Sequence, residues 1–217
     1  MTGSWNSTKK FNREALEWDE NPQRRLIAEK VGKAILETGK SAGWINALEI
    51  GCGTGLVSLL IAPHTEKLTA IDTSREMVEV LRYKISKSGI SNIRVLCSDL
   101  ETFTACAGKE ERFDLIYCSM SLHHIQDTGA VIGSFSNLLA QGGTLAIADL
   151  EPEDGSFHED PAENVHHGFE RSTLSGLFSR NGLGETSFRT IHIIRKPGRN
   201  SAMAEYPVFL ATASTII

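Results

Sequence analysis

The sequence predicts an α/β fold, a doubly wound and mostly parallel sheet with helices on both faces. Strand-like apolar runs alternate five times with helical patterns, a glycine-rich turn follows the first run, and two further strands close the chain. Since crossovers through a helix are right-handed and return parallel, this alternation gives a parallel sheet covered on both faces. The 217 residues, 41% of them hydrophobic, suffice for one such domain.

The first half of the chain predicts a leading helix, three strands and two further helices. Asn21 is a capping residue, and Pro22 after it suits the first helical position. Glycines end two of the helices, and Thr73 or Ser74 can cap the last of them. The strands are expected at 44–50, 67–72 and 93–97, and the helices at 21–39, 56–62 and 74–88, with the middle helix stopped by Pro63.

In the second half, the polar stretch 102–111 gives no clear prediction. Gly142 and Gly143 are expected to turn the chain before the fifth strand. The short connection at 196–200 suits an antiparallel hairpin, because a parallel return needs a long crossover. The strands are expected at 113–118, 144–150, 186–194 and 204–213, and the helices at 128–140 and 171–181, the second stopped by Gly182.

Composition narrows the class of protein. Lys plus Arg number 22 and Asp plus Glu 27, a net charge of −5, which disfavours a nucleic-acid partner. No apolar run approaches the length of a membrane span, and residues 1–10 are too polar for a signal peptide, so we expect a cytoplasmic protein. The four cysteines form no C-x-x-C pair, which favours reduced thiols.

The glycine-rich turn, 47–55, predicts a nucleotide-like ligand. Glycines at 51, 53 and 55 let the backbone lie against a ligand and turn sharply. Leu56 stands where the dinucleotide fingerprint needs its third small residue, which weakens an NAD-linked oxidoreductase. The turn also lacks the G-K-[ST] of a P-loop, and Glu49 would repel phosphate. A ligand without a pyrophosphate fits better.

Three acids follow three consecutive strands. Asp72 can accept hydrogen bonds from two vicinal ribose hydroxyls, and Asp99 can accept one from an exocyclic amine such as that of adenine. Glu49 can support the turn or a cationic ammonium group. Together they suit a cationic nucleoside.

Several motifs follow one another in order and register over residues 44–150. They are E-x-G-x-G-x-G at 49–55, Ile71-Asp72-x-Ser74 with Met77, Ser98-Asp99-Leu100, Phe113-Asp114 through Leu122-His123-His124, and Gly142-Gly143-Thr144-Leu145. In these motifs the chain resembles class I S-adenosylmethionine-dependent methyltransferases, most closely the subgroup of quinone-biosynthesis methyltransferases.

The resemblance implies a seven-stranded sheet whose last strand is antiparallel, a Rossmann-like methyltransferase fold. It also implies S-adenosylmethionine as cofactor and S-adenosylhomocysteine as product. The implied cofactor-binding residues are Glu49, Gly51, Cys52, Gly53 and Gly55 in the turn, Asp72, Thr73 and Met77 around ribose and adenine, Ser98, Asp99 and Leu100 on adenine, and Cys118 and Ser119 near the methionine part.

Methyl transfer asks mainly for alignment, because the sulfonium already activates its methyl group. A base is needed only for an acceptor that must lose a proton, and histidine serves near neutral pH. The candidates are His123, His124 and His166. The histidines and acids of 151–168 lack the spacing of a metal site, so we expect no metal.

We therefore expect an N-terminal flap at 1–20 and a single methyltransferase domain at 21–217, with a loop insertion at 151–169 over the acceptor site. The expected partner is a small-molecule acceptor of unidentified structure, without nucleic acid or a membrane span, and the chain is expected to be a monomer or homodimer. Two alternatives stay open: a degenerate methyltransferase fold acting as a binding or scaffold protein, and a protein methyltransferase.

Overall fold

The computed structural model describes residues 8–38, 44–106, 108, 111–158, 160, 163–198 and 202–215. In this part of the chain seven strands form one sheet in the order β3-β2-β1-β4-β5-β7-β6, and β7 runs antiparallel to both of its neighbours. The strands are β1 (Trp44–Ile50), β2 (Thr65–Asp72), β3 (Ile93–Cys97), β4 (Phe113–Ser119), β5 (Leu139–Leu150), β6 (Ser187–Pro197) and β7 (Met203–Ser214).

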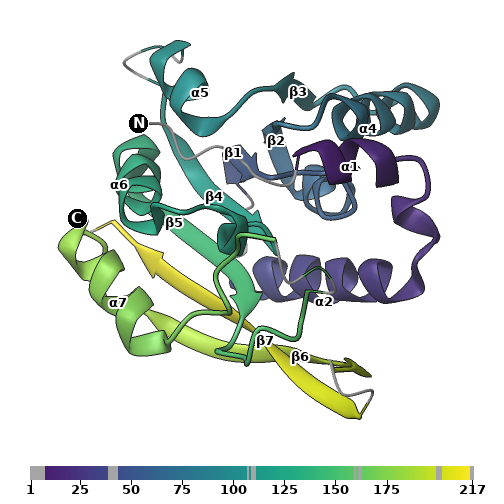
Figure 1. Cartoon of the computed structure of the whole chain (residues 1–217). Helices are drawn as coiled ribbons and strands as arrows, with labels where there is room; N and C mark the ends of the chain where they lie inside the picture. Colours follow the sequence, from purple (N-terminus) through teal and green to yellow (C-terminus); the bar gives the residue numbers. More distant parts are fainter. Residues whose placement is uncertain are drawn as a thin grey trace.

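Helices cover both faces of the sheet, and α1 lies beside α4 at one end (Figure 1). The α-helices are α1 (Thr8–Glu14), α2 (Pro22–Thr38), α3 (Ser58–Ile61), α4 (Arg75–Ser88), α5 (Leu100–Cys106), α6 (Thr128–Leu138) and α7 (Arg171–Arg180). Short 3-10 turns lie at Trp18–Glu20, Ala62–His64 and Leu122–His124. Within the described residues, no helix combines the length and the apolar character needed to cross a bilayer.

The hydrophobic core has two main layers. One packs α5, α6 and α7 against the sheet around Phe113, Phe135 and Phe178, and the other packs α2 and α3 against the opposite face around Ile35 and Tyr117. These side chains are almost wholly buried, and each large apolar group removed from water contributes about 1.5–3 kcal/mol. The two layers hold the carboxyl ends of the parallel strands at one edge.

The predicted fold class is confirmed, including the antiparallel last strand. Strands 44–50 and 93–97 have the predicted bounds. Ser74 caps α4 by accepting a hydrogen bond from the Met77 N–H, and Gly89, at φ +65°, ends that helix as predicted. The predicted end of α2 near Gly39 lies outside the described residues.

Two local predictions were wrong, and one helix lies largely in the stretch for which the sequence gave no prediction. The chain does not turn at Gly142 and Gly143, because β5 already begins at Leu139 and passes through them with an irregular register. Pro63 does not stop a helix, since it lies inside the 3-10 turn that continues α3. The stretch 102–111 contains most of helix α5, whose start is capped by Asp99 accepting from the Thr102 N–H at 2.7 Å.

Candidate functional site

A cavity of about 370 Å³ lies where β1, β2 and β4 end. This volume lies within the usual range of small-molecule sites, about 300–1,000 Å³. The glycine-rich turn and the ends of β2 and β4 form one side. The other side is formed by α1, the start of α2, the segment 157–158 and the far end of β6. Segments far apart in the sequence therefore share one site.

Three glycines shape the turn after β1, at φ values of +71° (Gly51), +53° (Gly53) and +81° (Gly55). A Cβ on Gly51 would lie 2.3 Å from Ser121 Oγ, and one on Gly55 would lie 2.2 Å from Leu81 Cδ1. A Cβ on Gly53 would meet no described atom within 4 Å. Two glycines are thus required by packing, whereas Gly53 borders the open cavity.

Asp72 ties this turn to the end of β2. Its Oδ2 accepts a hydrogen bond from the Gly53 N–H and its Oδ1 one from the Ser74 N–H, both at 2.8 Å. Burial raises the pKa of the Asp72 carboxyl above its usual value, against these backbone donors. The carboxyl group faces the cavity and fixes the backbone around it.

Glu49 is the buried acid beneath the turn. Its Oε2 accepts hydrogen bonds from the hydroxyls of Ser58 and Tyr117, the second at 3.0 Å. Burial raises the pKa of Glu49 to about 8, although the two hydroxyl donors oppose the shift. At neutral pH the carboxyl group is therefore mostly protonated. A cation bound nearby would favour its deprotonation.

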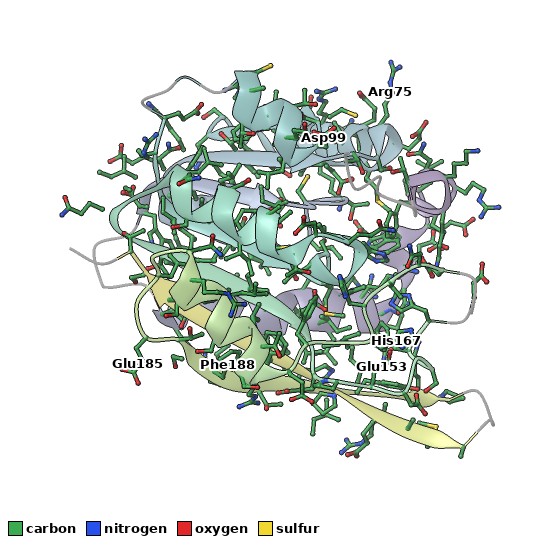
Figure 2. All side chains as sticks on the ribbon, turned by 60° about the vertical axis from the view of Figure 1, so that its left-hand side comes forward. Arg75, Asp99, Glu153, His167, Glu185 and Phe188 are labelled. Carbon is green, nitrogen blue, oxygen red and sulfur yellow. The ribbon has the colours of Figure 1, made fainter. Side chains whose placement is uncertain are left out.

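The structure brings together some of the predicted cofactor residues and not others. The cavity is lined by Glu49, Gly51, Cys52, Gly53, Asp72, Thr73, Met77 and Ser119, but not by Gly55, Ser98, Asp99, Leu100 or Cys118. Asp99 instead caps α5, and in Figure 2 it lies near that helix, well away from His167.

His123 forms a hydrogen-bonded pair with a carboxylate that the sequence did not single out. Its Nδ1 lies 2.7 Å from Oδ1 of Asp149, which stands near the end of β5, and its backbone N–H donates to Asp149 Oδ2. Since a carboxylate only accepts, Nδ1 carries the proton and Nε2 keeps its lone pair. This orientation is typical of a general base held by an acid.

Two more imidazoles lie beside His123 in the cavity wall. The ring centroids of His123 and His124 are 4.2 Å apart, and those of His123 and His158 are 5.1 Å apart. Burial and the neighbouring His123 lower the pKa of both His124 and His158, the latter to about 4. Both rings are neutral at pH 7.

His166 lies elsewhere. Its Nε2 is 2.9 Å from the carbonyl oxygen of Ile125 and 3.2 Å from that of Gln126, and it does not line the cavity. The ring therefore fixes the 151–169 loop to the chain after the Leu122–His124 turn. We do not carry its predicted catalytic role into the proposal below.

Sequence reasoning missed Asp149 and His158. A signal for Asp149 was available, because it is an acid near the carboxyl end of a buried strand, as Glu49 and Asp72 are. His158 gave no such signal, because its place beside His123 depends on how the loop folds back. Within the described residues, no group of three or more His, Cys, Asp or Glu side chains is arranged to hold a metal ion.

The segment at 8–20 covers the cavity from the turn to the loop. Thr8 Oγ1 lies 3.3 Å from Thr73 Oγ1, and Ser74 Oγ donates to Asn12 Oδ1 at 2.6 Å. At the other side, Phe11 packs edge-on against the His124 ring, with centroids 5.2 Å apart. The segment thus contacts both the end of β2 and the Leu122–His124 turn after β4.

The different surroundings of the glycines predict different effects of alanine. Gly55→Ala should destabilise the fold by about 1–3 kcal/mol beyond its left-handed backbone strain, because the new methyl group meets the fully buried Leu81. Gly53→Ala should cost only the left-handed backbone strain, about 1–2 kcal/mol, yet it narrows the cavity. Thermal unfolding and ligand titration of both variants measure the two effects. Equal loss of stability would contradict this assignment.

The sheet order, the reversed β7 and the site at the strand ends match the Rossmann-like fold of solved methyltransferase structures. Residues 47–143 match the family described as "Methyltransferase domain". The resemblance that the sequence motifs predicted is therefore confirmed.

Named relatives show the same resemblance. A methyltransferase of Schizosaccharomyces pombe, itself uncharacterised, is 31% identical over 151 residues, which are 64% of this chain and 53% of its own. The ubiquinone biosynthesis O-methyltransferase of Coxiella burnetii is 33% identical over 105 residues, 48% of this chain and 43% of its own. The chain thus spans about half the length of these curated relatives.

Among solved structures, the N-methyltransferase NodS of Bradyrhizobium japonicum, crystallised with S-adenosyl-L-homocysteine, superposes with a TM-score of 0.66 at 20% identity. The match covers 97% of this chain and 98% of NodS. At this identity the likeness shows a common fold.

Proposed function

We propose that this chain is an S-adenosylmethionine-dependent methyltransferase acting on a small-molecule acceptor. The observation that carries the proposal is the single cavity shared by two kinds of residue. The turn after β1 and Asp72 line one half, which suits the adenosyl and methionyl groups. His123, held by Asp149, lines the other half. Donor and acceptor would meet between them.

In this proposal the chain's residues align the cofactor with the acceptor and remove a proton from the acceptor. Asp72 would accept hydrogen bonds from the ribose hydroxyls, and Glu49 would face the positive charge of the cofactor. S-adenosylmethionine supplies the activated methyl group when bound. His123 would take a proton from the acceptor at Nε2, while Asp149 holds Nδ1–H in place. Segment 8–20 and the 151–169 loop would close over the acceptor.

Calorimetric titration of the full chain with S-adenosylmethionine and with S-adenosylhomocysteine tests the proposal. Both are expected to bind at one site per chain. If neither compound bound, the proposal would be wrong, and a degenerate fold that serves as a scaffold would remain. Methyl transfer only to protein, with none to small acceptors, would favour a protein methyltransferase.

Glu49 predicts a pH dependence of cofactor binding. In the free protein its pKa is about 8, so near pH 7 the carboxyl group is mostly protonated. A bound cation favours the carboxylate, so binding should release protons and the affinity should rise with pH up to about 8 and then level off. Calorimetry in buffers of different ionisation enthalpy measures the release. Glu49→Gln should abolish it, and an unchanged release in that variant would contradict the assignment.

A further inference from the structure

His158 repeats the arrangement of His123 from another part of the chain. Its Nδ1 lies 3.3 Å from Oε2 of Glu163, a carboxylate that also accepts from Lys10 Nζ at 3.1 Å. By the same reasoning as for His123, Nδ1–H faces the carboxylate and Nε2 keeps its lone pair. Two imidazole–carboxylate pairs therefore stand side by side in the acceptor half of the cavity.

The Nε2 atom of His158 is buried and has no hydrogen-bond partner among the described residues. The side chain is only 11% exposed. A buried polar atom left without a partner costs about 1–3 kcal/mol, so an atom of this kind in a cavity wall points to a bound group that supplies the missing donor. Nε2 of His123 likewise makes no hydrogen bond within the part of the chain that is described.

The two Nε2 atoms, both hydrogen-bond acceptors without a partner among the described residues, favour a ligand with two hydrogen-bond donors. An alcohol has one O–H and would leave one imidazole unpaired, whereas a neutral primary amine has two N–H bonds on one atom. If His123 and His158 each accept one of them, and the carbon substituent takes a third direction, the nitrogen lone pair is left in the fourth. The hydrogen bonds would then aim the lone pair that attacks the methyl group.

The local charge favours an amine over a vicinal diol, which also carries two donors. Lys10 balances Glu163 at 3.1 Å. Asp149 is fully buried, and its only ion pair within the described residues is with His123. The Asp149 carboxylate, 2.7 Å from Nδ1 of His123, therefore stabilises positive charge on a ligand that contacts this ring and gives a neutral diol no comparable gain.

We propose that His158 is a second acceptor-binding residue and that the methyl acceptor is a primary amine held between His123 and His158. This proposal rests on the proposed function. The neutral amine R–NH₂ donates one N–H to each Nε2, and its lone pair forms a bond to the methyl carbon of the sulfonium while the C–S electron pair returns to sulfur. The R–NH₂⁺–CH₃ formed in this way then gives one proton to His123 Nε2. The products are R–NH–CH₃, S-adenosylhomocysteine and the proton on His123.

The test uses the full chain saturated with S-adenosylhomocysteine and three probes of similar size, namely benzylamine, benzyl alcohol and catechol. Calorimetry should show benzylamine binding about tenfold or more tightly than the alcohol, the value of one added hydrogen bond to a buried acceptor. His158→Phe should remove this preference and leave S-adenosylhomocysteine affinity unchanged. His167→Phe is the matched control, because His167 lies in the same loop, beside Glu153 in Figure 2, and does not line the cavity.

The outcomes separate the two proposals. Tighter binding of catechol or benzyl alcohol, a preference that survives in His158→Phe, or no binding of any probe would overturn the amine assignment while the proposed function stands. Failure of S-adenosylhomocysteine to bind, seen in the first titration, would remove both. A ¹⁵N shift of the His158 Nε2 resonance on adding benzylamine, absent with the alcohol, would report the hydrogen bond directly.

Discussion

Replacing His123 by alanine should lower kcat by about 10²–10⁴-fold, the usual contribution of a positioned general base. The Nδ1 atom of His123 is 2.7 Å from Asp149, so Asp149→Asn should also lower kcat, because an amide can stabilise the wrong tautomer of the ring. Transfer from radiolabelled S-adenosylmethionine to small amine, phenol and thiol acceptors measures the effect.

Two controls distinguish the loss of a base from a general loss of function. S-adenosylhomocysteine affinity should stay unchanged in His123→Ala, since the ring lines the acceptor half of the cavity. His64→Ala, an exposed histidine on the Ala62–His64 turn, should behave as the wild type. If His123→Ala retained full kcat for acceptors that must lose a proton, the ring would have only a packing role.

Replacing Asp72 by alanine should weaken cofactor binding by about 10–100-fold, the value of one or more charge-assisted hydrogen bonds. Two losses contribute to this effect. The ribose hydroxyls lose their acceptor, and the Gly53 and Ser74 N–H groups lose the carboxylate that holds the turn in place. Calorimetric titration with S-adenosylhomocysteine gives the change in affinity.

Glu66→Ala is the matched control for Asp72→Ala, because Glu66 lies on the same strand, β2, and is exposed. It should bind the cofactor as the wild type does. A melting temperature measured for both variants separates loss of binding from loss of fold. Unchanged affinity in Asp72→Ala would contradict the placement of the ribose.

The sequence was sufficient for the parts of the fold that depend on local pattern. Strands 44–50 and 93–97 are rich in apolar residues and are flanked by glycine or short polar residues, so their bounds follow from the chain itself. Helix α5 was missed because Thr102–Glu111 is polar, and only Leu100 and Phe103 of that helix are buried in the core. Its stability comes from tertiary packing, which a local pattern does not contain.

The candidate site divides in the same way. The acids at the ends of β1 and β2 could be aligned from sequence, because parallel strands end at one edge of the sheet. Asp99 has the same sequence signal, yet its carboxylate caps α5. The pairing of His158 with Glu163 depends on how the loop folds. The approach of His158 to His123 brings together two residues that lie more than 30 positions apart in the sequence. No spacing rule predicts such a contact.

The half of the cavity that we propose for the acceptor is built largely from residues outside 47–143. Phe11, Trp18, Phe157, His158 and Lys196 all lie outside that match, whereas the turn after β1 and Asp72 lie inside it. Loops and terminal segments tolerate exchange better than the strands that support them. Grafting the acceptor-side segments of another chain onto this sheet, or these onto another, should therefore transfer acceptor choice while the methyl donor stays the same.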